Sequence, residues 1–412
     1  MQLKDKILKS LEKLKSEPIL LLTVPFALIL FIPIIILSPI ILIRFGFFHS
    51  DRLGHFAVNS EIFFCENQYV KINNRITFDC FYFPTKPCND QLGLMISRKV
   101  SIYSKILIRP FCLIARNIFF LSQHVTGRSS NSDYDTNHVL DKTKLQINLT
   151  KNEVKRGEKI LKKLKLKNNK IICVGVRDNS YLKKKYKNQN FSYHDHRNDE
   201  ITKYVLGIRY LLKKGYTVFR MGSITSKKIK INHKNFLDYS NSRIKSDFMD
   251  VYISYVCKLF ISNNTGLDAL AVTFRKPILH IGSLPFGAIS TFSNRYFNTM
   301  SNYFSLEKKR FLRLTEIFDK NIQYLWKKED FKNKNIKIVH PTKKDIFRYF
   351  IETINIIEKP KRAKKHLLLE KKFKDLYSTY VKKNLDGKKY YHNNIKTKIL
   401  FSFLNTNRHL LK

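Results

Sequence analysis

The sequence predicts an α/β protein whose main domain is built on a parallel sheet, and its apolar segments indicate this most clearly. Residues 171–176 (IICVGV) are a short, continuous hydrophobic run, and 216–221, 258–262 and 277–281 are short segments that are mainly apolar. Such runs are typical of strands that are covered by helices on both faces. Segments with helical spacing of apolar residues alternate with these strands along the chain. The alternation favours a Rossmann-like domain over residues 166–357.

Composition indicates how many domains the chain can form, what kind of partner it binds and in which redox compartment it folds. At 412 residues with 43% hydrophobic content, the chain is long enough for two or three folded domains. Its formal net charge of +45 indicates an anionic partner, such as an acidic membrane or a phosphorylated substrate. No nucleic-acid-reading motif accompanies the charge, so nucleic acid is not expected. The six cysteines are dispersed without a C-x-x-C pair, which fits a reducing cytosol rather than a zinc site or disulfide framework.

Two segments at the N-terminus predict attachment to a membrane. Residues 1–17 place leucines at helical spacing among lysines, which is typical of a basic amphipathic helix. Residues 18–43 contain no charged side chain and are long enough to span a bilayer. Four prolines interrupt this segment, so a re-entrant hairpin competes with a straight transmembrane crossing. We expect an inner (cytoplasmic) membrane location with the soluble domains facing the cytoplasm.

A first soluble domain is expected over residues 44–165. A polar break ends at His55, at the start of a helical pattern, and this histidine is a candidate general base. Asp51 and Glu61 are acidic alternatives for the same role. Farther on, Asp133 and Asp135 form a D-x-D pair, a pattern that can hold a divalent metal. Because polar residues rather than a buried strand precede the pair, no metal site is expected.

Polar residues stand where the predicted strands end, and ligands bind there in open α/β sheets. An Arg-Asp pair directly follows the 171–176 strand, and an arginine and a glycine close the 216–221 strand. A dense polar stretch before the intervening helix ends in a histidine and an arginine, which suit a diphosphate or a sugar. The residues are Arg177, Asp178, His196, Arg197, Arg220 and Gly222. A solvated Arg-Asp pair is the alternative for the first two.

The turn after the 258–262 strand is the second part of the candidate site. Asn264, Thr265 and Gly266 join this strand to a helix that contains Asp268. Backbone N–H groups and the positive end of the helix dipole converge at such a turn, which suits a phosphate. A capped turn without a ligand is the alternative. No G-x-G-x-x-G, P-loop or G-x-S-x-G pattern is present, which argues against dinucleotide cofactors, P-loop ATPases and α/β-hydrolases.

Four strings resemble a group of bacterial glycosyltransferases linked to surface-polysaccharide synthesis. They are DRLGHFAVNSEIFF, GVRDNSYL, YHDHRNDEITKYVLGIRYLLKKGYTVFRMG and FISNNTGLDALAVTFRKPILHIG. The loop at Thr265-Gly266 is similar to the donor-phosphate loop of lipopolysaccharide heptosyltransferases, although Asn264 stands where an acidic residue usually precedes that pair. The resemblance covers roughly residues 45 to 355. It implies the GT-B architecture of two Rossmann-like domains, in which residues 44–165 bind the acceptor and 166–357 the donor.

The combined prediction is a membrane-associated glycosyltransferase. It would move a sugar from a nucleotide-sugar donor to a lipid-linked or surface-polysaccharide acceptor without a metal or other cofactor. His55, Arg177 and Arg197 are the expected catalytic residues. Asp178, His196, Arg220, Gly222, Asn264, Thr265, Gly266 and Asp268 are expected to bind the donor. A membrane-tethered scaffold of the same fold, lacking turnover, is the alternative. Residues 358–412 are expected to form a basic tail, either lying on acidic lipid or solvated.

Overall fold

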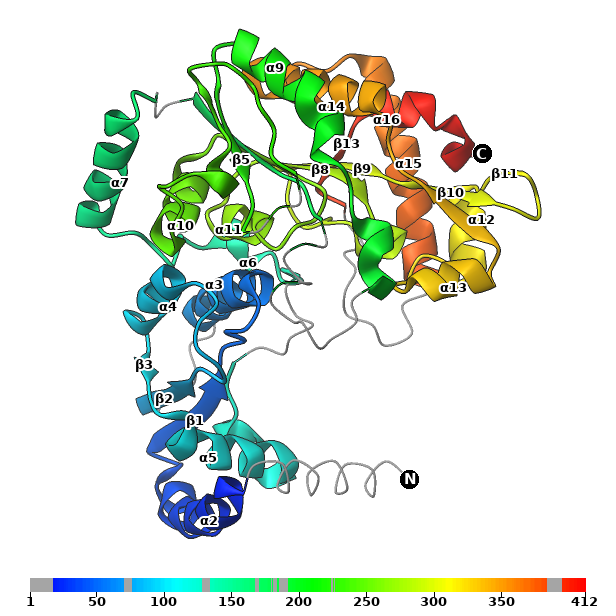
Figure 1. The fold of residues 1–412 in the computed structure, drawn as a ribbon. Coiled ribbons are helices and arrows are strands. Elements are labelled where there is room, and N and C mark those ends of the chain that lie inside the picture. The colour runs from blue at the N-terminus through cyan, green and yellow to red at the C-terminus, as the bar shows by residue number, and fades with distance from the viewer. Residues whose placement is uncertain are drawn as a thin grey trace. The chain divides into compact units, whose positions relative to one another are not determined.

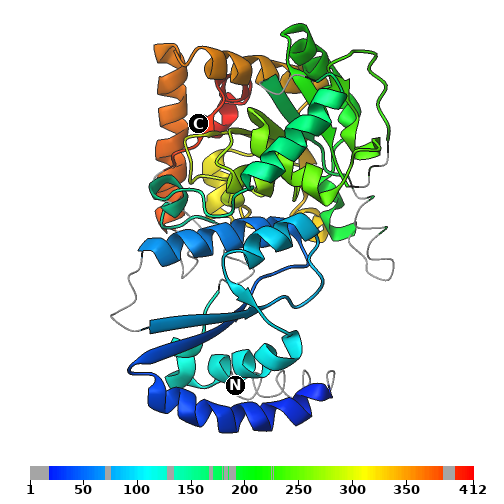
Figure 2. The same cartoon turned by 90° about the vertical axis from the view of Figure 1, so that its left-hand side faces the viewer.

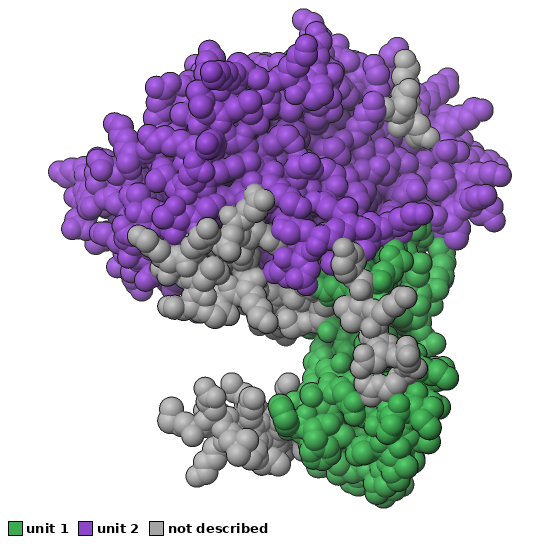
Figure 3. All heavy atoms as spheres, turned by 180° about the vertical axis from the view of Figure 1, so that it is seen from behind, with its two compact units in different colours: residues 1–133, 146–148 green, residues 134–145, 149–412 purple. Residues whose placement is uncertain are grey.

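The computed structural model describes residues 18–69, 76–127, 134–166, 170–178, 180, 184, 192–223, 225, 227–383 and 395–412. The chain forms two compact units (Figures 1 and 3). Unit 1 comprises residues 1–133 and 146–148, and unit 2 comprises residues 134–145 and 149–412. The predicted amphipathic helix over residues 1–17 and Asp133 lie outside the described residues. Both units combine helices with parallel strands, which confirms the α/β class.

Unit 1 is built on a small parallel sheet in the order β1-β2-β3. Its strands are β1 (Ile41–Phe47), β2 (Ile76–Tyr82) and β3 (Ser101–Ile102). Helices α3 (Leu53–Tyr69) and α4 (Asp90–Ser97) connect these strands in turn. Helix α5 (Lys105–Asn117) packs on β1 and β2, the 3-10 helix η1 (Phe119–His124) follows it, and the apolar helix α2 (Ile19–Leu37) packs on α5 (Figure 2).

Glu61 has a structural role in unit 1 that excludes it as a general base. Its side chain on α3 is completely buried. Its carboxylate accepts hydrogen bonds from the backbone N–H groups of Gln146, at 2.9 Å, and Ile147, at 2.8 Å. These bonds fasten residues 146–148 to unit 1. A carboxylate that is buried and committed to backbone donors is not available to a substrate, so the suggestion that Glu61 serves as a base was wrong.

Unit 2 contains a seven-stranded parallel sheet in the order β13-β9-β8-β7-β4-β5-β6. The strands are β4 (Ile171–Gly175), β5 (Thr217–Met221), β6 (Phe236–Leu237), β7 (Leu259–Ser262), β8 (Ile278–Ser283), β9 (Tyr296–Met300) and β13 (Lys398–Ile399). Every residue of β4, β5 and β7 is buried, so helices cover both faces of the sheet, as the continuous apolar runs predict. The four strands that the sequence predicts are confirmed.

The direction of winding reverses between β4 and β7. From β4 the chain proceeds through β5 to β6 at one edge of the sheet, and β7 then returns to pair with β4 on its other side. From there β8 and β9 extend the sheet in the opposite direction. In open α/β sheets, such a reversal opens a crevice outside the carboxyl ends of the two strands, and ligands bind in it.

The remaining elements of unit 2 surround this sheet. Helix α9 packs with α14, and α10 packs with α11. A small antiparallel sheet has the order β11-β10-β12. The helices are α6 (Val139–Lys142), α7 (Lys151–Lys163), α9 (Val205–Lys213), α10 (Asp247–Val256), α11 (Asp268–Thr273), α12 (Leu314–Asp319), α13 (Lys328–Asn333) and α14 (Lys343–Glu358), and the strands are β10 (Asn302–Ser305), β11 (Arg310–Phe311) and β12 (Ile336–Val339).

The C-terminal segment is an integral part of unit 2 rather than a separate basic tail. It contains α15 (Lys364–Lys383), strand β13 and α16 (Phe401–Thr406). Phe373 and Tyr377, one helical turn apart on α15, are completely buried in the core. The Tyr377 hydroxyl donates a hydrogen bond to the carbonyl of Phe286 at 2.9 Å. The segment that was expected to lie on lipid or in water therefore packs in the core of unit 2.

Replacing Phe373 with alanine tests this integration. Because its ring is completely buried, Phe373→Ala should lower the free energy of unfolding of unit 2 by about 3–5 kcal/mol. Leu368→Ala on the same helix is the control, since this side chain is 58% exposed and should cost no more than about 0.5 kcal/mol. Urea unfolding followed by the fluorescence of Trp326 in unit 2 measures both. If both substitutions lower the free energy of unfolding by equally small amounts, the segment is better described as a solvated tail.

Candidate active site

The carboxyl ends of β4 and β7 bring the predicted residues of unit 2 together. Arg177 lies two residues after β4, and Asn263 follows β7 directly. The buried Asn263 side chain joins the two: its Oδ1 accepts a hydrogen bond from the Arg177 backbone N–H at 2.6 Å. Its Nδ2 donates to the carbonyl of Arg197 at 3.3 Å. One amide therefore holds the backbone of both arginines at the point where the sheet reverses.

The turn after β7 has a fixed and unusual conformation. Asn264 has a φ of +62°, in the left-handed region that asparagine tolerates better than most residues. The Ser262 hydroxyl accepts a hydrogen bond from the Thr265 N–H at 3.1 Å and donates one to the Asp268 carboxylate at 2.6 Å. Helix α11 begins only at Asp268 and has six residues, so its dipole is weaker than the sequence suggests. Positive charge at this site must come mainly from the arginines.

Arg177 and Arg197 are both partly buried and repel each other. Burial, followed by the neighbouring charge of Arg177, lowers the pKa of Arg197 to about 10. Burial also lowers the pKa of Arg177, whose Nε is buried without a hydrogen-bond partner among the described residues. Both guanidinium groups remain charged near neutral pH. Cations held together in this way favour an anion that can accept several hydrogen bonds, such as a diphosphate.

Asp268 compensates only part of this charge. Burial raises the pKa of its carboxyl group to about 7, although the hydrogen bond from Ser262 and the charge of Arg197 act in the opposite direction. His280 lies nearby, with its Nδ1 3.9 Å from Asp268 Oδ2. Burial lowers the pKa of His280 to about 4, so the ring is neutral and adds no positive charge. Near neutral pH, Asp268 therefore exists in both its neutral and its ionised form.

Aromatic side chains lie beside the arginines. The Arg197 guanidinium stands over the ring of Trp326, 5.6 Å from its centroid, and Trp326 is 41% exposed. The His196 ring packs on Phe331 with centroids 5.4 Å apart. Burial and the charge of Arg197 lower the pKa of His196 to about 4, so this histidine is neutral. The site thus combines positive charge with an exposed aromatic surface on which a nucleobase or sugar ring could stack.

Arg220 and Gly222 shape the loop that follows β5. Arg220 is buried, and its guanidinium donates hydrogen bonds to Ser240 at 2.7 Å, Thr225 at 2.8 Å and Asp238 at 3.1 Å. A side chain at Gly222 would place its Cβ 2.6 Å from Thr225. The two terminal nitrogens of Arg220 are engaged within this loop, whereas its Nε is buried without a hydrogen-bond partner among the described residues. The donor contact of Arg220 stays a prediction.

Three other predicted donor residues lie in the turn after β7 or next to Arg177 in the sequence. Thr265 is partly exposed and Gly266 is exposed, so both are accessible to a ligand. Asp178 is partly exposed, and its Oδ1 accepts a hydrogen bond from the Ser180 N–H at 2.9 Å. Their role in donor binding stays a prediction. Sequence analysis assigned no role to Asn263, Ser262 or Trp326. The first two lie in the string that carries the resemblance, but only the residues after them were selected, and Trp326 lies outside the quoted strings.

His55 and Asp51 belong to unit 1. His55 lies in the first turn of α3, as expected, with its ring centroid 6.3 Å from that of His49. Burial, with a smaller contribution from His55, lowers the pKa of His49. Asp51 is exposed, and its carboxylate lies 3.7 Å from Nε of Arg52. The candidate base therefore stands within a pair of histidines, one of which the sequence did not indicate.

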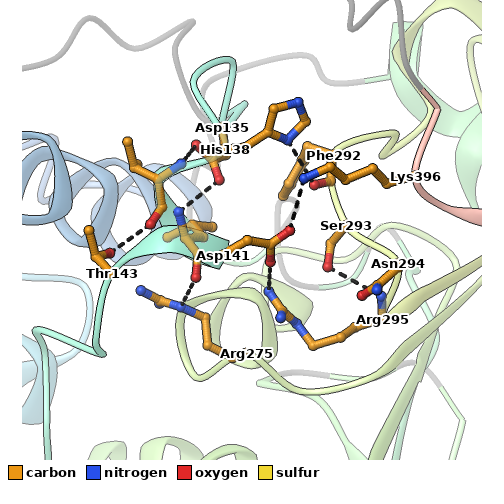
Figure 4. A network of polar contacts seen from close by, with 12 residues as sticks. Asp135, His138, Asp141, Thr143, Arg275, Phe292, Ser293, Asn294, Arg295 and Lys396 are labelled. Carbon is orange, nitrogen blue, oxygen red and sulfur yellow. Dashed lines mark hydrogen bonds and ion pairs between the residues drawn. The ribbon is translucent and has the colours of Figure 1, made fainter. Parts of the chain in front are cut away.

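Asp135 is a structural residue of unit 2. Its buried carboxylate accepts hydrogen bonds from the N–H groups of Val139 at 2.7 Å and Leu140 at 2.9 Å, and so caps α6 (Figure 4). Asp141 pairs with Arg295 at 2.6 Å and with Lys396 at 3.3 Å, in a network that fastens residues 134–145 to unit 2. Within the described ranges, no group of three or more His, Cys, Asp or Glu residues is placed to hold a metal ion.

Comparisons with known proteins give a limited result. No protein-family model and no curated protein matches the chain. A glycosyl transferase family 9 structure from Veillonella parvula resembles it with a TM-score of 0.38 and 10% sequence identity, over 59% of this chain and 82% of that one. The E. coli ADP-heptose lps heptosyltransferase II structure gives a TM-score of 0.33 and 10% identity, over 58% and 84% of the two chains. These TM-scores are too low to assign a family.

Removing one of the two arginine charges tests, without any substrate, whether Arg177 and Arg197 form an anion-binding site. We expect Arg197→Met to raise the free energy of unfolding in phosphate-free buffer, by roughly 1 kcal/mol, because it relieves repulsion and burial of charge. The same variant should lose the stabilisation that inorganic pyrophosphate gives the wild-type protein. Calorimetric unfolding with and without pyrophosphate measures both effects.

Arg209→Met is the matched control, because Arg209 lies exposed on α9. It should change neither the stability nor the response to pyrophosphate. A pyrophosphate response that persists in Arg197→Met would place the anion site elsewhere.

Proposed function

We propose that this protein is a glycosyltransferase that uses a nucleotide-sugar donor. The observation that carries the proposal is the pair Arg177 and Arg197, held by Asn263 outside the carboxyl ends of β4 and β7. The sheet reverses there, and a partly buried cationic site with an exposed aromatic neighbour suits a nucleoside diphosphate. The sequence resemblance to glycosyltransferases of surface-polysaccharide synthesis points to the same chemistry.

In this proposal, the arginines act on the leaving group. Breaking the bond between the sugar and the diphosphate leaves negative charge on the diphosphate oxygens, and fixed guanidinium groups stabilise that charge as it develops. Thr265 and Gly266 would contact the same phosphates through the turn after β7. The acceptor hydroxyl must lose a proton, and we assign its removal to His55, with Asp51 as the alternative. The reaction as written requires no metal.

The class of acceptor is inferred from helix α2 and from the sequence resemblance. Helix α2 is long and apolar enough to cross a membrane, with a mean hydropathy of 3.0, by its length and composition. Together with the sequence resemblance, it supports an acceptor that is lipid-linked or part of a surface polysaccharide. It also supports a location at the inner membrane with the soluble units in the cytoplasm.

A panel of nucleotides tests the donor site directly. We expect one of UDP, GDP, CDP, ADP and dTDP to raise the melting temperature of the detergent-solubilised protein, since a ligand that binds only the folded state stabilises it by mass action. At a concentration about 100 times the Kd, the stabilisation should reach about 2.7 kcal/mol. Arg177→Ala and Thr265→Ala should abolish the shift.

The controls and outcomes of the panel separate the alternatives. Arg209→Ala and Thr202→Ala, at exposed positions, should keep the shift. A shift that appears only with magnesium would contradict a metal-free site. If no nucleotide shifts a folded sample, the protein is better explained as a membrane-tethered scaffold of the same fold.

Asp268 should make donor binding depend on pH. Its raised pKa of about 7 means that the carboxyl group is neutral below pH 7 and ionised above it. The ionised form competes with the diphosphate for Arg197, so the affinity for a nucleotide sugar should fall by about tenfold from about pH 6 to about pH 8. A nucleotide sugar is the proper probe because its diphosphate does not titrate in this range. Isothermal titration calorimetry should show a flat profile for Asp268→Asn, and a steep one would contradict the assignment.

A further inference from the structure

Helix α2 packs with one side on the rest of unit 1, mainly on α5 and β1. Its buried or partly buried residues recur every three or four positions, which places them on a single stripe of the helix. They are Leu20, Thr23, Val24, Ala27, Phe31, Ile34 and, at the C-cap, Ser38. Phe31 contacts the rings of Phe45 on β1 and Phe111 on α5, with centroids 5.7 and 5.4 Å apart. The middle of the stripe, from Val24 to Ile34, therefore joins the core of unit 1. The helix itself lies along α5 (Figure 2).

The opposite side of α2 is equally apolar but exposed. Leu22, Ile29 and Ile36, spaced two turns apart on this side, are 70%, 63% and 71% exposed. No charged residue occurs anywhere from Pro18 to Ile43. A helix that packs on a water-soluble domain normally presents polar residues to the solvent. An apolar face of this extent indicates a partner that removes it from water.

Packing on unit 1 conflicts with a transmembrane orientation of α2. A helix of 19 residues is about 28 Å long, close to the thickness of the hydrocarbon layer. If α2 crossed the membrane, the elements packed along its side would have to enter the hydrocarbon with it. These include α5, with Lys105, Arg109 and Arg116, and the three-stranded sheet of unit 1. Charged side chains are costly there, and three of them lie on α5.

We propose that α2 lies in the plane of the membrane surface, with its exposed side embedded in one leaflet and its packed side holding unit 1 against the lipid. Three cations on α5, at positions 105, 109 and 116, recur on one side of that helix, and a basic helix suits anionic headgroups. Arg116 is exposed, with its guanidinium over the ring of Phe47, and the other two are partly exposed. Phe119 and Phe120 are exposed on η1, and aromatic residues favour the membrane interface. This combination favours lipid over a second copy of the chain. The inference deepens the proposed membrane location but does not depend on the donor chemistry.

Vesicle flotation of the full-length protein tests the partner. The wild-type protein should float with vesicles, more strongly when phosphatidylglycerol is added to phosphatidylcholine. The variant Leu22→Ser/Ile29→Ser/Ile36→Ser should bind at least about 100-fold more weakly, because three side chains lose their transfer into lipid. The matched control, Leu94→Ser/Leu206→Ser/Leu306→Ser, removes three exposed apolar side chains outside α2 and should float like wild type. Dimerisation that the first variant abolishes, without vesicle binding, would overturn the proposal in favour of a second copy.

Depth measurement then distinguishes the two orientations. A fluorescent label on a single cysteine introduced at Leu22, Ile29 or Ile36 is quenched by lipids brominated at different depths, after Cys80 and Cys88 are replaced by serine. An in-plane helix gives the same shallow depth at all three positions. A spanning helix places Ile29 much deeper than the other two, and that result would overturn the proposal. The Leu22→Ser/Ile29→Ser/Ile36→Ser variant should still show the nucleotide-induced rise in melting temperature. Loss of vesicle binding in this variant would then be independent of the proposed donor site.

Discussion

The site of unit 2 depends on holding Arg177 and Arg197 together against their mutual repulsion. Two partly buried guanidinium groups cost stability in the absence of an anion, because burial disfavours their charge and each opposes the other. The fold offsets this cost through the parallel pairing of β4 with β7 and through Asn263, which binds the backbone of both arginines. The cations therefore stay in position before any ligand arrives, and such preorganisation is what an enzyme needs to stabilise a developing anion.

The sequence was sufficient to locate this edge of the sheet but not to choose among its arginines. Arg177 and Arg220 both stand at the ends of apolar runs, and local pattern gives them equal weight. Arg220 differs because Asp238 and Ser240, from a later loop, surround its guanidinium. Trp326 was missed for a related reason, since it reaches Arg197 from about 130 residues farther along the chain. Partners that come from distant segments are set by the packing of the sheet and leave no local signal.

The two ends of the chain illustrate the limits of composition. Residues 358–412 are rich in lysine and suggest a tail, yet a few aromatic side chains on α15 are enough to anchor it, because each fully buried ring contributes several kcal/mol. Helix α2 shows the reverse limit. Its apolar residues surround the whole helix, so periodicity cannot reveal which side packs on protein. Only the stripe from Leu20 to Ser38 in the folded unit distinguishes the two sides.

Asp268 links proton binding to anion binding in the proposed donor site. Its carboxyl group is near the midpoint of its titration at neutral pH, within reach of the field of Arg197. A bound diphosphate would disfavour the ionised carboxylate, so donor binding should be accompanied by proton uptake, and the two equilibria must affect each other equally. Conversely, loss of the diphosphate favours ionisation of Asp268, which then neutralises part of the arginine charge. The empty site is thereby less strained than the arginines alone would make it, and product release meets less electrostatic resistance.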